Sequence, residues 1–188
     1  NNYIHNLRSN AVRTYQTSVN ATINDNVFNN IANIPGMGDS GVTQNSCITT
    51  AGTGLTCYRN KITNVAYIGI GWRGDNAMVK WNYIDTFCQE LSDGAAIYTY
   101  NGDSSYPSTI QCEVMYNTVI NGVGAGEGSI QPTGQAMGFY ADDGSNNIKV
   151  WNNNISNITE YGVYLHNANN IDIQYNKFYD VWQNLRLY

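Results

Sequence analysis

The sequence of 188 residues has little charge, since only 12% of its residues are charged, and it has only three prolines. Disordered chains combine high charge with low hydrophobicity, whereas 42% of these residues are hydrophobic, so the composition excludes disorder. No apolar run approaches the roughly 18 to 20 residues that a membrane-spanning helix needs. The strong helix formers Ala, Leu, Glu, Lys and Arg are scarce, which excludes a coiled coil.

Basic residues and metal-ligand motifs are also few. The nine Lys and Arg are scattered, and the formal net charge is -5. Because phosphate neutralisation by basic residues dominates nucleic-acid affinity, we expect no nucleic-acid partner. The two histidines do not complete a zinc set, and the cysteines show no C-x-x-C spacing, so we expect no bound metal.

The four cysteines allow two interpretations. They form two disulfides in an oxidising compartment, or they are four buried free thiols. The candidate pairs are Cys47 with Cys57 and Cys88 with Cys112, and the other two pairings stay open. The second pair would close the base of a long insertion.

Asparagine, by contrast, is the most frequent residue, and it marks an internal repeat. A motif of Asn, any residue and then an aliphatic residue or Phe occurs seven times, with successive spacings of 24, 34, 22, 35, 36 and 23 residues. The motif begins at Asn2, Asn26, Asn60, Asn82, Asn117, Asn153 and Asn176. The short spacings define a unit of about 23 residues, and the long ones add an insertion of about 12.

Each unit carries three short strands. The Asn motif is one of them, and two further segments alternate apolar and polar residues, a pattern typical of strands. Three strands and three bends in about 23 residues describe one coil of a parallel β-helix. An Asn tolerates the left-handed backbone of a sharp bend, and stacked Asn amides can form a hydrogen-bonded ladder. Leucine is too rare for a leucine-rich repeat.

The whole chain resembles the right-handed parallel β-helix superfamily of pectate-lyase-like proteins. The resemblance implies an all-β solenoid of about seven coils, with residues 1–188 in a single domain. Insertions fall within residues 32–59, 88–112 and 121–136 and are expected to wall a groove on an outer face. Because Asn1 begins inside a repeat, without an initiator Met or a signal sequence, we expect a fragment of a longer chain.

Three segments carry a narrower likeness. They are Asp93-Gly-Ala-Ala-Ile-Tyr98, Gly138-Phe-Tyr-Ala-Asp142-Asp143-Gly144 and Gly162-Val-Tyr-Leu-His166. These segments are similar to segments of secreted bacterial β-helix glycoside hydrolases. The likeness implies a glycoside hydrolase that acts on a polysaccharide or oligosaccharide, secreted or at the cell surface.

Aligning the alternating segments on their small residues predicts two outward columns. The first column is Tyr98, Tyr140 and Tyr164, and the second is Tyr100, Asp142 and His166. Stacked tyrosines bordered by carboxylates suit sugars, whose C–H faces pack on aromatic rings. A tyrosine ladder that only packs is the alternative interpretation. His5 lies far from these columns and is expected at the surface.

Asp142 is the first candidate catalytic residue, and Asp93 is the second carboxylate. Asp143 is expected in a turn with Gly144, beside the substrate, because Asp-Gly is an ordinary turn pair. His166 is expected to orient Asp142 or to bind a sugar hydroxyl. Glu90 and Glu127, in the insertions, are reserve candidates.

Two other functions remain open. The first is a non-catalytic β-helix that binds glycans or has a structural role in a cell-surface, filament or phage-fibre protein, with end-to-end contacts to flanking coils or another chain. The second is a polysaccharide lyase, which would use Ca²⁺ and a basic residue. Arg73 and Lys80 lie near the second insertion, but we expect no Lys or Arg in the Asp142 column. An acidic protein also attracts polyuronates poorly.

Overall fold

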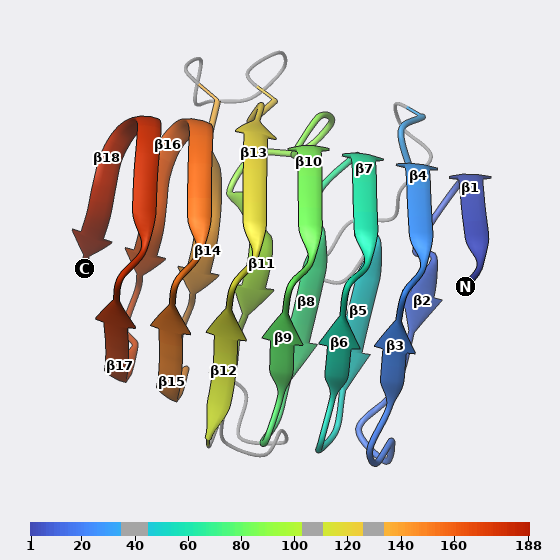
Figure 1. Cartoon of the computed structure of the whole chain (residues 1–188), viewed down its shortest axis with the longest axis horizontal. Coiled ribbons are helices and arrows are strands. Elements are labelled where there is room, and N and C mark those ends of the chain that lie inside the picture. The colour runs from blue at the N-terminus through green and yellow to red at the C-terminus, as the bar shows by residue number, and fades with distance from the viewer. Residues whose placement is uncertain (35–44, 103–110, 126–133) are drawn as a thin grey trace.

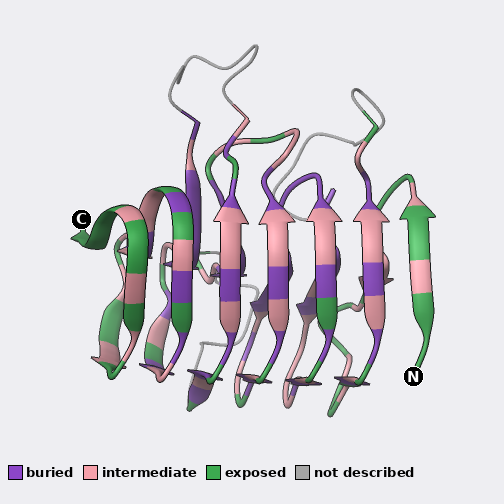
Figure 2. Ribbon diagram, turned by 45° about the horizontal axis from the view of Figure 1, so that its top comes forward, coloured by how far each residue is buried: buried purple, intermediate pink, exposed green. Residues whose placement is uncertain are grey.

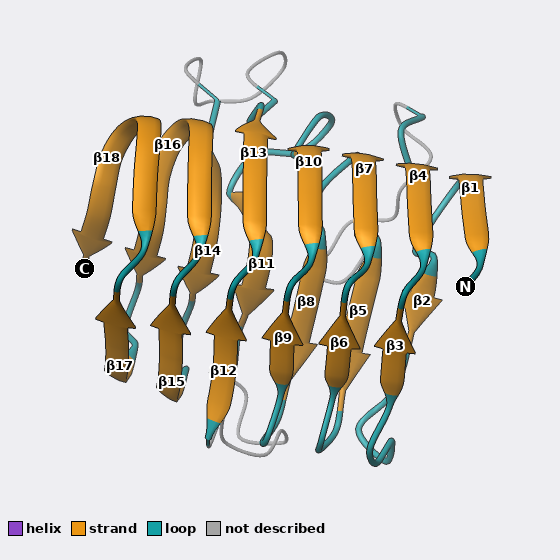
Figure 3. Cartoon of the chain, in the orientation of Figure 1, coloured by secondary structure: helices purple, strands orange, loops and turns teal. Residues whose placement is uncertain are grey.

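The computed structural model describes residues 1–34, 45–102, 111–125 and 134–188 (Figure 1). These residues form strands, turns and bends without any helix (Figure 3). Accordingly, no helix in the described part of the chain is long and apolar enough to cross a membrane. Residues 35–44, 103–110 and 126–133, one segment within each of the three ranges predicted to contain an insertion, lie outside the described ranges.

The strands form three faces, and every pairing between them is parallel. The first face contains β1 (Tyr3–Leu7), β4 (Val27–Ile31), β7 (Lys61–Val65), β10 (Tyr83–Phe87), β13 (Thr118–Gly122) and the first halves of β16 (Asn154–Leu165) and β18 (Lys177–Leu187). The second face contains β2 (Val12–Arg13), β5 (Ile48–Ala51), β8 (Ile70–Arg73), β11 (Gly94–Thr99), β14 (Ala136–Ala141) and the second halves of β16 and β18. The third face contains β3 (Thr22–Asn24), β6 (Thr56–Tyr58), β9 (Met78–Lys80), β12 (Cys112–Met115), β15 (Asn146–Trp151) and β17 (Asn169–Gln174).

The chain passes from the first to the second to the third face and then starts the next coil. In Figure 1 it rises on the near side, descends on the far side and advances from right to left, which makes the solenoid right-handed. Each Asn motif begins one coil, so the seven motifs correspond to seven coils, the last of which is formed by β18. The predicted all-β parallel β-helix is therefore confirmed.

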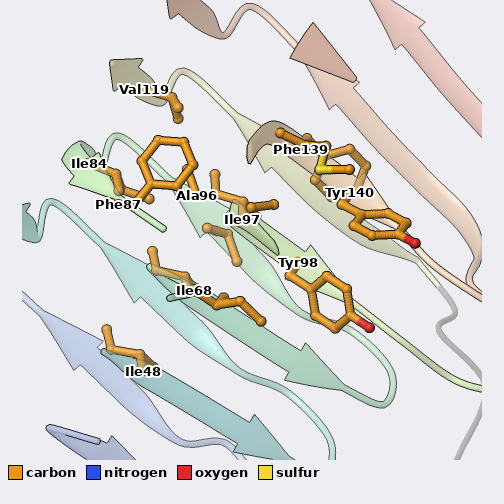
Figure 4. Close-up of a cluster of buried hydrophobic side chains, with 14 of the residues drawn as sticks. Ile48, Ile68, Ile84, Phe87, Ala96, Ile97, Tyr98, Val119, Phe139 and Tyr140 are labelled. Atoms are coloured by element: carbon orange, nitrogen blue, oxygen red, sulfur yellow. The ribbon is translucent and has the colours of Figure 1, made fainter. Parts of the chain in front are cut away.

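The core is a set of inward columns in which aliphatic and aromatic side chains stack from coil to coil. One column contains Ile48, Ile70, Ile97, Phe139 and Val163, all at most 1% exposed (Figure 4). Figure 2 shows the buried positions alternating with more exposed ones along the strands. Thr99, Ala141 and Leu165, which stack two residues further along the same strands, are also buried.

The Asn ladder is present, with a hydrogen-bond pattern that repeats from coil to coil. The Asn82 backbone N–H and Nδ2 both donate to Asn117 Oδ1, at 2.9 and 3.0 Å, and Asn117 Nδ2 donates to the Val79 carbonyl at 2.9 Å. The same arrangement links Asn117 to Asn153. Each ladder amide therefore satisfies buried backbone groups at the bend between the third and the first face.

The left-handed backbone, however, is not at the ladder asparagines, so this part of the sequence interpretation is wrong. Positive φ angles occur at the residue before the ladder Asn, such as Trp81 at 57° and Tyr116 at 59°. They also occur four residues after each ladder Asn, at Asn6, Asn30, Asn64, Thr86, Asn121, Asn157 and Asp180. Hydrogen bonding and left-handed bends are thus separate roles, carried by different positions of the motif.

The cysteines are all free thiols, which contradicts the two predicted disulfides and confirms the alternative interpretation. Cys47, Cys57, Cys88 and Cys112 are each fully buried in the core. Burial raises the pKa of the Cys57 thiol to about 12. A buried thiol with a raised pKa behaves as a small hydrophobic side chain.

Candidate functional site

The second face brings the predicted tyrosine column together. Tyr98 pairs with Tyr140, and Tyr140 pairs with Tyr164, in the register of β11, β14 and β16. The ring centroids are 5.2 Å apart for the first pair and 4.6 Å apart for the second. Figure 4 shows the Tyr98 and Tyr140 hydroxyls pointing to the same side, away from the aliphatic side chains.

The column is less open than predicted. Tyr98 and Tyr140 are only 5% and 4% exposed, whereas Tyr164 is partly exposed. Burial, followed by the nearby Asp142 charge, raises the pKa of both buried phenols far above the ordinary value. These hydroxyls therefore stay protonated and act as hydrogen-bond donors.

Asp142 continues the second column, directly after β14, and three groups orient its carboxylate. The Tyr98 hydroxyl donates to Oδ2 at 2.7 Å, the Asp143 backbone N–H donates to Oδ1 at 2.9 Å, and His166 Nδ1 lies 2.9 Å from Oδ1. His166 thus occupies the predicted orienting position, one coil beyond Asp142. The Asp142 side chain is 16% exposed, so it is accessible but firmly held.

Asp143 and Gly144 form the predicted turn, in which the Ser145 N–H donates to the Asp142 carbonyl at 3.0 Å. The Asp143 carboxylate accepts a hydrogen bond from Asn167 Nδ2 at 2.7 Å and lies 3.2 Å from His166 Nδ1. One ligand atom from each of Asp142, Asp143 and His166 lies within 4.8 Å of the other two. These are the described residues that could hold a divalent cation.

Asp93 lines the same cavity as Asp142. The cavity has a volume of about 340 Å³, and Tyr67, Tyr98 and Tyr100 form much of its wall. Asp93 is exposed as a residue, but its carboxyl group is partly buried. This burial, followed by the charge of Asp142, raises the pKa of Asp93 above the ordinary value, while the charge of His166 lowers it. The two predicted carboxylates therefore line one cavity, where different groups surround each of them.

Tyr67 is a cavity residue that the sequence interpretation missed. Its hydroxyl donates to the Asp93 carbonyl at 2.7 Å, which fixes the chain where β11 begins. The ring passes over Gly94, where a Cβ would lie 2.3 Å from Tyr67 Cε2 and 2.9 Å from Cys88 Sγ. Glycine at position 94 is therefore required for Tyr67 to reach Asp93.

Replacing Gly94 with Ala is expected to destabilise the fold by about 1–3 kcal/mol, because the added methyl group overlaps the Tyr67 ring. Urea denaturation would measure this loss. Gly71→Ala is the matched control, since a Cβ there meets no atom closer than 3.6 Å. Equal stability of the two variants would show that the Tyr67 contact is unimportant.

The raised pKa of Asp93 predicts a pH-dependent effect on stability. A carboxyl whose folded-state pKa is raised destabilises the fold as the pH rises through and above the ordinary value of about 3.9. Because Asn cannot ionise, Asp93→Asn should raise the melting temperature at neutral pH. This gain should be smaller below about pH 3.9, where the aspartate is protonated in both states. Asn also tolerates the left-handed backbone at this position, where φ is 59°. Thermal melts of the wild type and the variant, at neutral pH and below about pH 3.9, test this prediction. The same difference in melting temperature at both pH values would contradict it.

The prediction that no Lys or Arg lies in the Asp142 column is wrong. Thr99 pairs with Trp72, so the next residues, Tyr100 and Arg73, share the column. The Arg73 guanidinium lies 4.8 Å from the Tyr100 ring centroid. Aligning Gly69-Ile70-Gly71-Trp72-Arg73 with the other alternating segments would have revealed this position.

The remaining candidates lie elsewhere. His5 is exposed on β1 and stacks on Tyr3 with ring centroids 4.7 Å apart, as expected for a surface residue. Lys80 forms an ion pair with Glu113 on the third face. Glu90 does not line the cavity, and Glu127 lies outside the described residues.

One more carboxyl near Asp93, Glu160, was not anticipated. Gln135 Nε2 donates to Glu160 Oε1 at 3.5 Å, and the Gln135 carbonyl accepts from the Asp93 N–H at 3.0 Å. Burial is the main cause of the raised pKa of Glu160, and the charge of Asp93 adds to it. No repeat position marks Glu160, because it lies where the register between β16 and β18 shifts.

No protein-family model and no curated protein matches this chain. Among solved structures, the chain is similar to the Streptococcus pneumoniae surface protein and adhesin PfbA, with 15% sequence identity and a TM-score of 0.47. The similarity covers 90% of this chain and 49% of that chain, so this chain spans about half the length of PfbA.

Proposed function

We propose that this chain belongs to a carbohydrate-active protein and carries the active site of a glycoside hydrolase, with Asp142 and Asp93 as its carboxylate pair. The observation that supports this proposal is that both carboxylates line one tyrosine-walled cavity on the second face. A glycosidase needs two carboxyl groups on either side of the bond that it cleaves. A glycan polymer as substrate would place the protein outside the cell, secreted or at the cell surface.

The environments of the two carboxyls suggest their roles. Asp93, whose pKa is raised, suits the general acid that protonates the leaving oxygen. Asp142, held by Tyr98, Asp143 and His166, suits the carboxylate that acts as nucleophile or activates water. Carboxyl groups about 5–5.5 Å apart retain the anomeric configuration, and those about 6.5–9.5 Å apart invert it. NMR of the first-formed product distinguishes these outcomes.

The surroundings of the pair suit a sugar. Tyr100 and Tyr164 present aromatic surface beside the carboxylates, and His166 and Asp143 add polar groups that can bind hydroxyls. This chemistry requires no cofactor.

Incubation with a panel of neutral and acidic polysaccharides tests the proposal. A hydrolase releases reducing ends without forming a double bond, whereas a lyase forms an unsaturated sugar that absorbs in the ultraviolet. Binding without any release would favour the non-catalytic alternative, in which the same tyrosines bind a glycan in a cell-surface or fibre protein.

The lyase alternative has one specific observation in its favour, the placement of Arg73 in the Asp142 column. A lyase would use such a cation to neutralise a uronate while a base removes a proton. If calcium supported this reaction, release of unsaturated product would stop on chelation and return on adding Ca²⁺. The hydrolase reaction should be insensitive to a chelator.

A further inference from the structure

The bend between the third and the first face carries an exposed aromatic pair. Trp81 and Tyr116 each precede a ladder Asn, and they lie on successive coils because Lys80 pairs with Met115 in the register of β9 and β12. Trp81 is 50% exposed and Tyr116 is 47% exposed. In Figure 1 the pair belongs to the bends that join β9 to β10 and β12 to β13. The two rings therefore form an aromatic surface in the middle of the solenoid, with further coils on both sides.

The two rings are nearly parallel but do not cover each other. Their planes differ by 8° and their centroids are 5.7 Å apart. Rings in full face-to-face contact would lie at about 3.5–4 Å, so each ring leaves part of its surface uncovered. On the coil before, the Tyr58 ring meets Trp81 edge-on, at 85° and with centroids 5.4 Å apart. Trp81 is therefore held between rings of the neighbouring coils.

The backbone at these two positions does not favour aromatic residues. The φ angles are 57° at Trp81 and 59° at Tyr116, in the left-handed region that bulky side chains rarely adopt. In other coils the same bend position holds Asp25 and Asn152, with φ of 60° and 56°. Asp and Asn tolerate this conformation best among the residues with a side chain. The fold therefore does not require Trp or Tyr here, and bulky residues in such conformations are concentrated at functional sites.

A cavity adjoins the Trp81 ring. Its volume is about 320 Å³, and Arg59, Lys61 and Tyr83 are among its other lining residues. The Arg59 guanidinium donates two hydrogen bonds to the Asp25 carboxylate, at 2.7 and 2.8 Å. The Lys61 ammonium group lies 5.9 Å from the Tyr83 ring centroid. The cavity thus places polar groups that can bind hydroxyls beside an exposed aromatic surface.

These features favour an uncharged glycan as the occupant. The C–H faces of sugars pack on aromatic rings, while their hydroxyls bind polar groups. The cations next to Trp81 are mostly paired, Arg59 with Asp25 and Lys80 with Glu113, which disfavours an anionic ligand. A second protein chain would need about 800 Å² on each partner, whereas two half-exposed rings offer on the order of 200 Å².

We infer that Trp81 and Tyr116 form a second glycan-binding surface, which binds uncharged sugar units and takes no part in cleavage. It lies at the bend that precedes the first face, whereas Asp142 follows β14 at the end of the second face. This inference takes its ligand class from the proposed function but does not require the hydrolase reaction. In a glycan-degrading protein, such a surface holds a polymer on the protein while the carboxylate cavity acts on it.

NMR titration of the Asp142→Asn variant of the chain tests this surface without cleavage of the probe. The probes are uncharged oligosaccharides of equal length from β-glucan, xylan, mannan and galactan, with oligogalacturonate as the charged comparison. The backbone amide signals of Asn82 and Asn117, which follow the two aromatic residues, give the affinity at this bend. We expect at least one uncharged probe to shift both signals. Added salt should leave that affinity unchanged, because no ion pair forms.

Two further variants localise the binding. The double variant Trp81→Asn/Tyr116→Asn should weaken binding at this bend about tenfold or more, because both stacking surfaces are lost. Its melting temperature should stay within about 4 °C of the wild-type value, because Asn suits the left-handed backbone. Tyr175→Asn is the matched control. Tyr175 has the same bend position, with φ of 57° and 75% exposure, but Asn152 separates it from Tyr116, so this variant should keep the affinity.

The outcomes separate this inference from the proposed reaction. Shifts at Asn82 and Asn117 that need the aromatic pair, without any cleavage by the wild type, would support the surface and contradict the hydrolase. Cleavage by the wild type without these shifts would overturn the inference and leave the hydrolase. The inference would also fail if no uncharged probe shifted the two signals, if the double variant bound as tightly as the wild type, or if oligogalacturonate bound there more tightly than every uncharged probe.

Discussion

Asp142→Asn is expected to lower kcat/KM for glycan hydrolysis by about 1,000-fold or more. The amide has the same shape as the carboxylate but can neither attack the sugar nor accept a proton, and catalysis by a positioned acid or base contributes about 100- to 10,000-fold. The Tyr98 hydroxyl can still donate to the amide oxygen, so the fold should be kept. Reducing-sugar release and a thermal melt, measured together, separate lost chemistry from lost structure.

The matched control is Asp172→Asn on β17. Asp172 lies on the third face, and its carboxylate accepts a hydrogen bond from Gln174 Nε2 at 2.8 Å. This variant should keep full activity. If Asp142→Asn also kept full activity on every glycan that the wild type cleaves, the assignment of the active site would be wrong.

Asn117→Leu is expected to give the largest loss of stability in the chain. The substitution removes acceptors for the N–H and Nδ2 of Asn82 and donors to the Val79 carbonyl and Asn153 Oδ1, all of them at a buried bend. Asn82 Nδ2 still donates to the Cys57 carbonyl, and Asn153 Oδ1 still accepts from the Asn117 backbone N–H, so the Asn82 N–H and the Val79 carbonyl are the two groups that lose their ladder partner. Each buried polar group left without a partner costs about 1–3 kcal/mol, so the free energy of unfolding should fall by about 2–6 kcal/mol. At the size of this chain, the melting temperature would fall by roughly 10 °C.

Asn154→Ala provides the comparison for the ladder. Asn154 is exposed at the start of β16, outside the ladder, and its substitution should change stability by less than about 0.5 kcal/mol. Chemical denaturation of both variants gives the two values. A loss for Asn117→Leu no larger than that for Asn154→Ala would mean that the ladder does not hold the coils together.

The architecture could be predicted from the sequence because a solenoid repeats one small set of constraints. The ladder Asn has to recur once per coil, and the alternation of Ile97, Tyr98 and Thr99 has to match that of Phe139, Tyr140 and Ala141 for the columns to stack. Register therefore follows from aligning the repeats. The placement of Asp142 in the column of His166, next to the column of Tyr98, follows in the same way.

Other features depend on contacts that no repeat encodes. Tyr98 is buried in the wall of a cavity that Tyr67 also lines, and Tyr67 lies outside the alternating segments. Arg73 was missed because Gly71 replaces the expected tyrosine and hides the alignment of its strand. The cysteines could not be assigned, because a buried thiol and a disulfide have the same sequence signature. The left-handed bends were placed on the wrong Asn, since two positions of the motif are rich in that residue.

The most direct test of the account is a crystal structure of the Asp142→Asn variant with an oligosaccharide that the wild type cleaves. The account predicts a glycosidic oxygen between Asp93 and residue 142, in the tyrosine-walled cavity. An oligosaccharide bound to the first or third face, with no sugar in contact with Asp93 or residue 142, would contradict it.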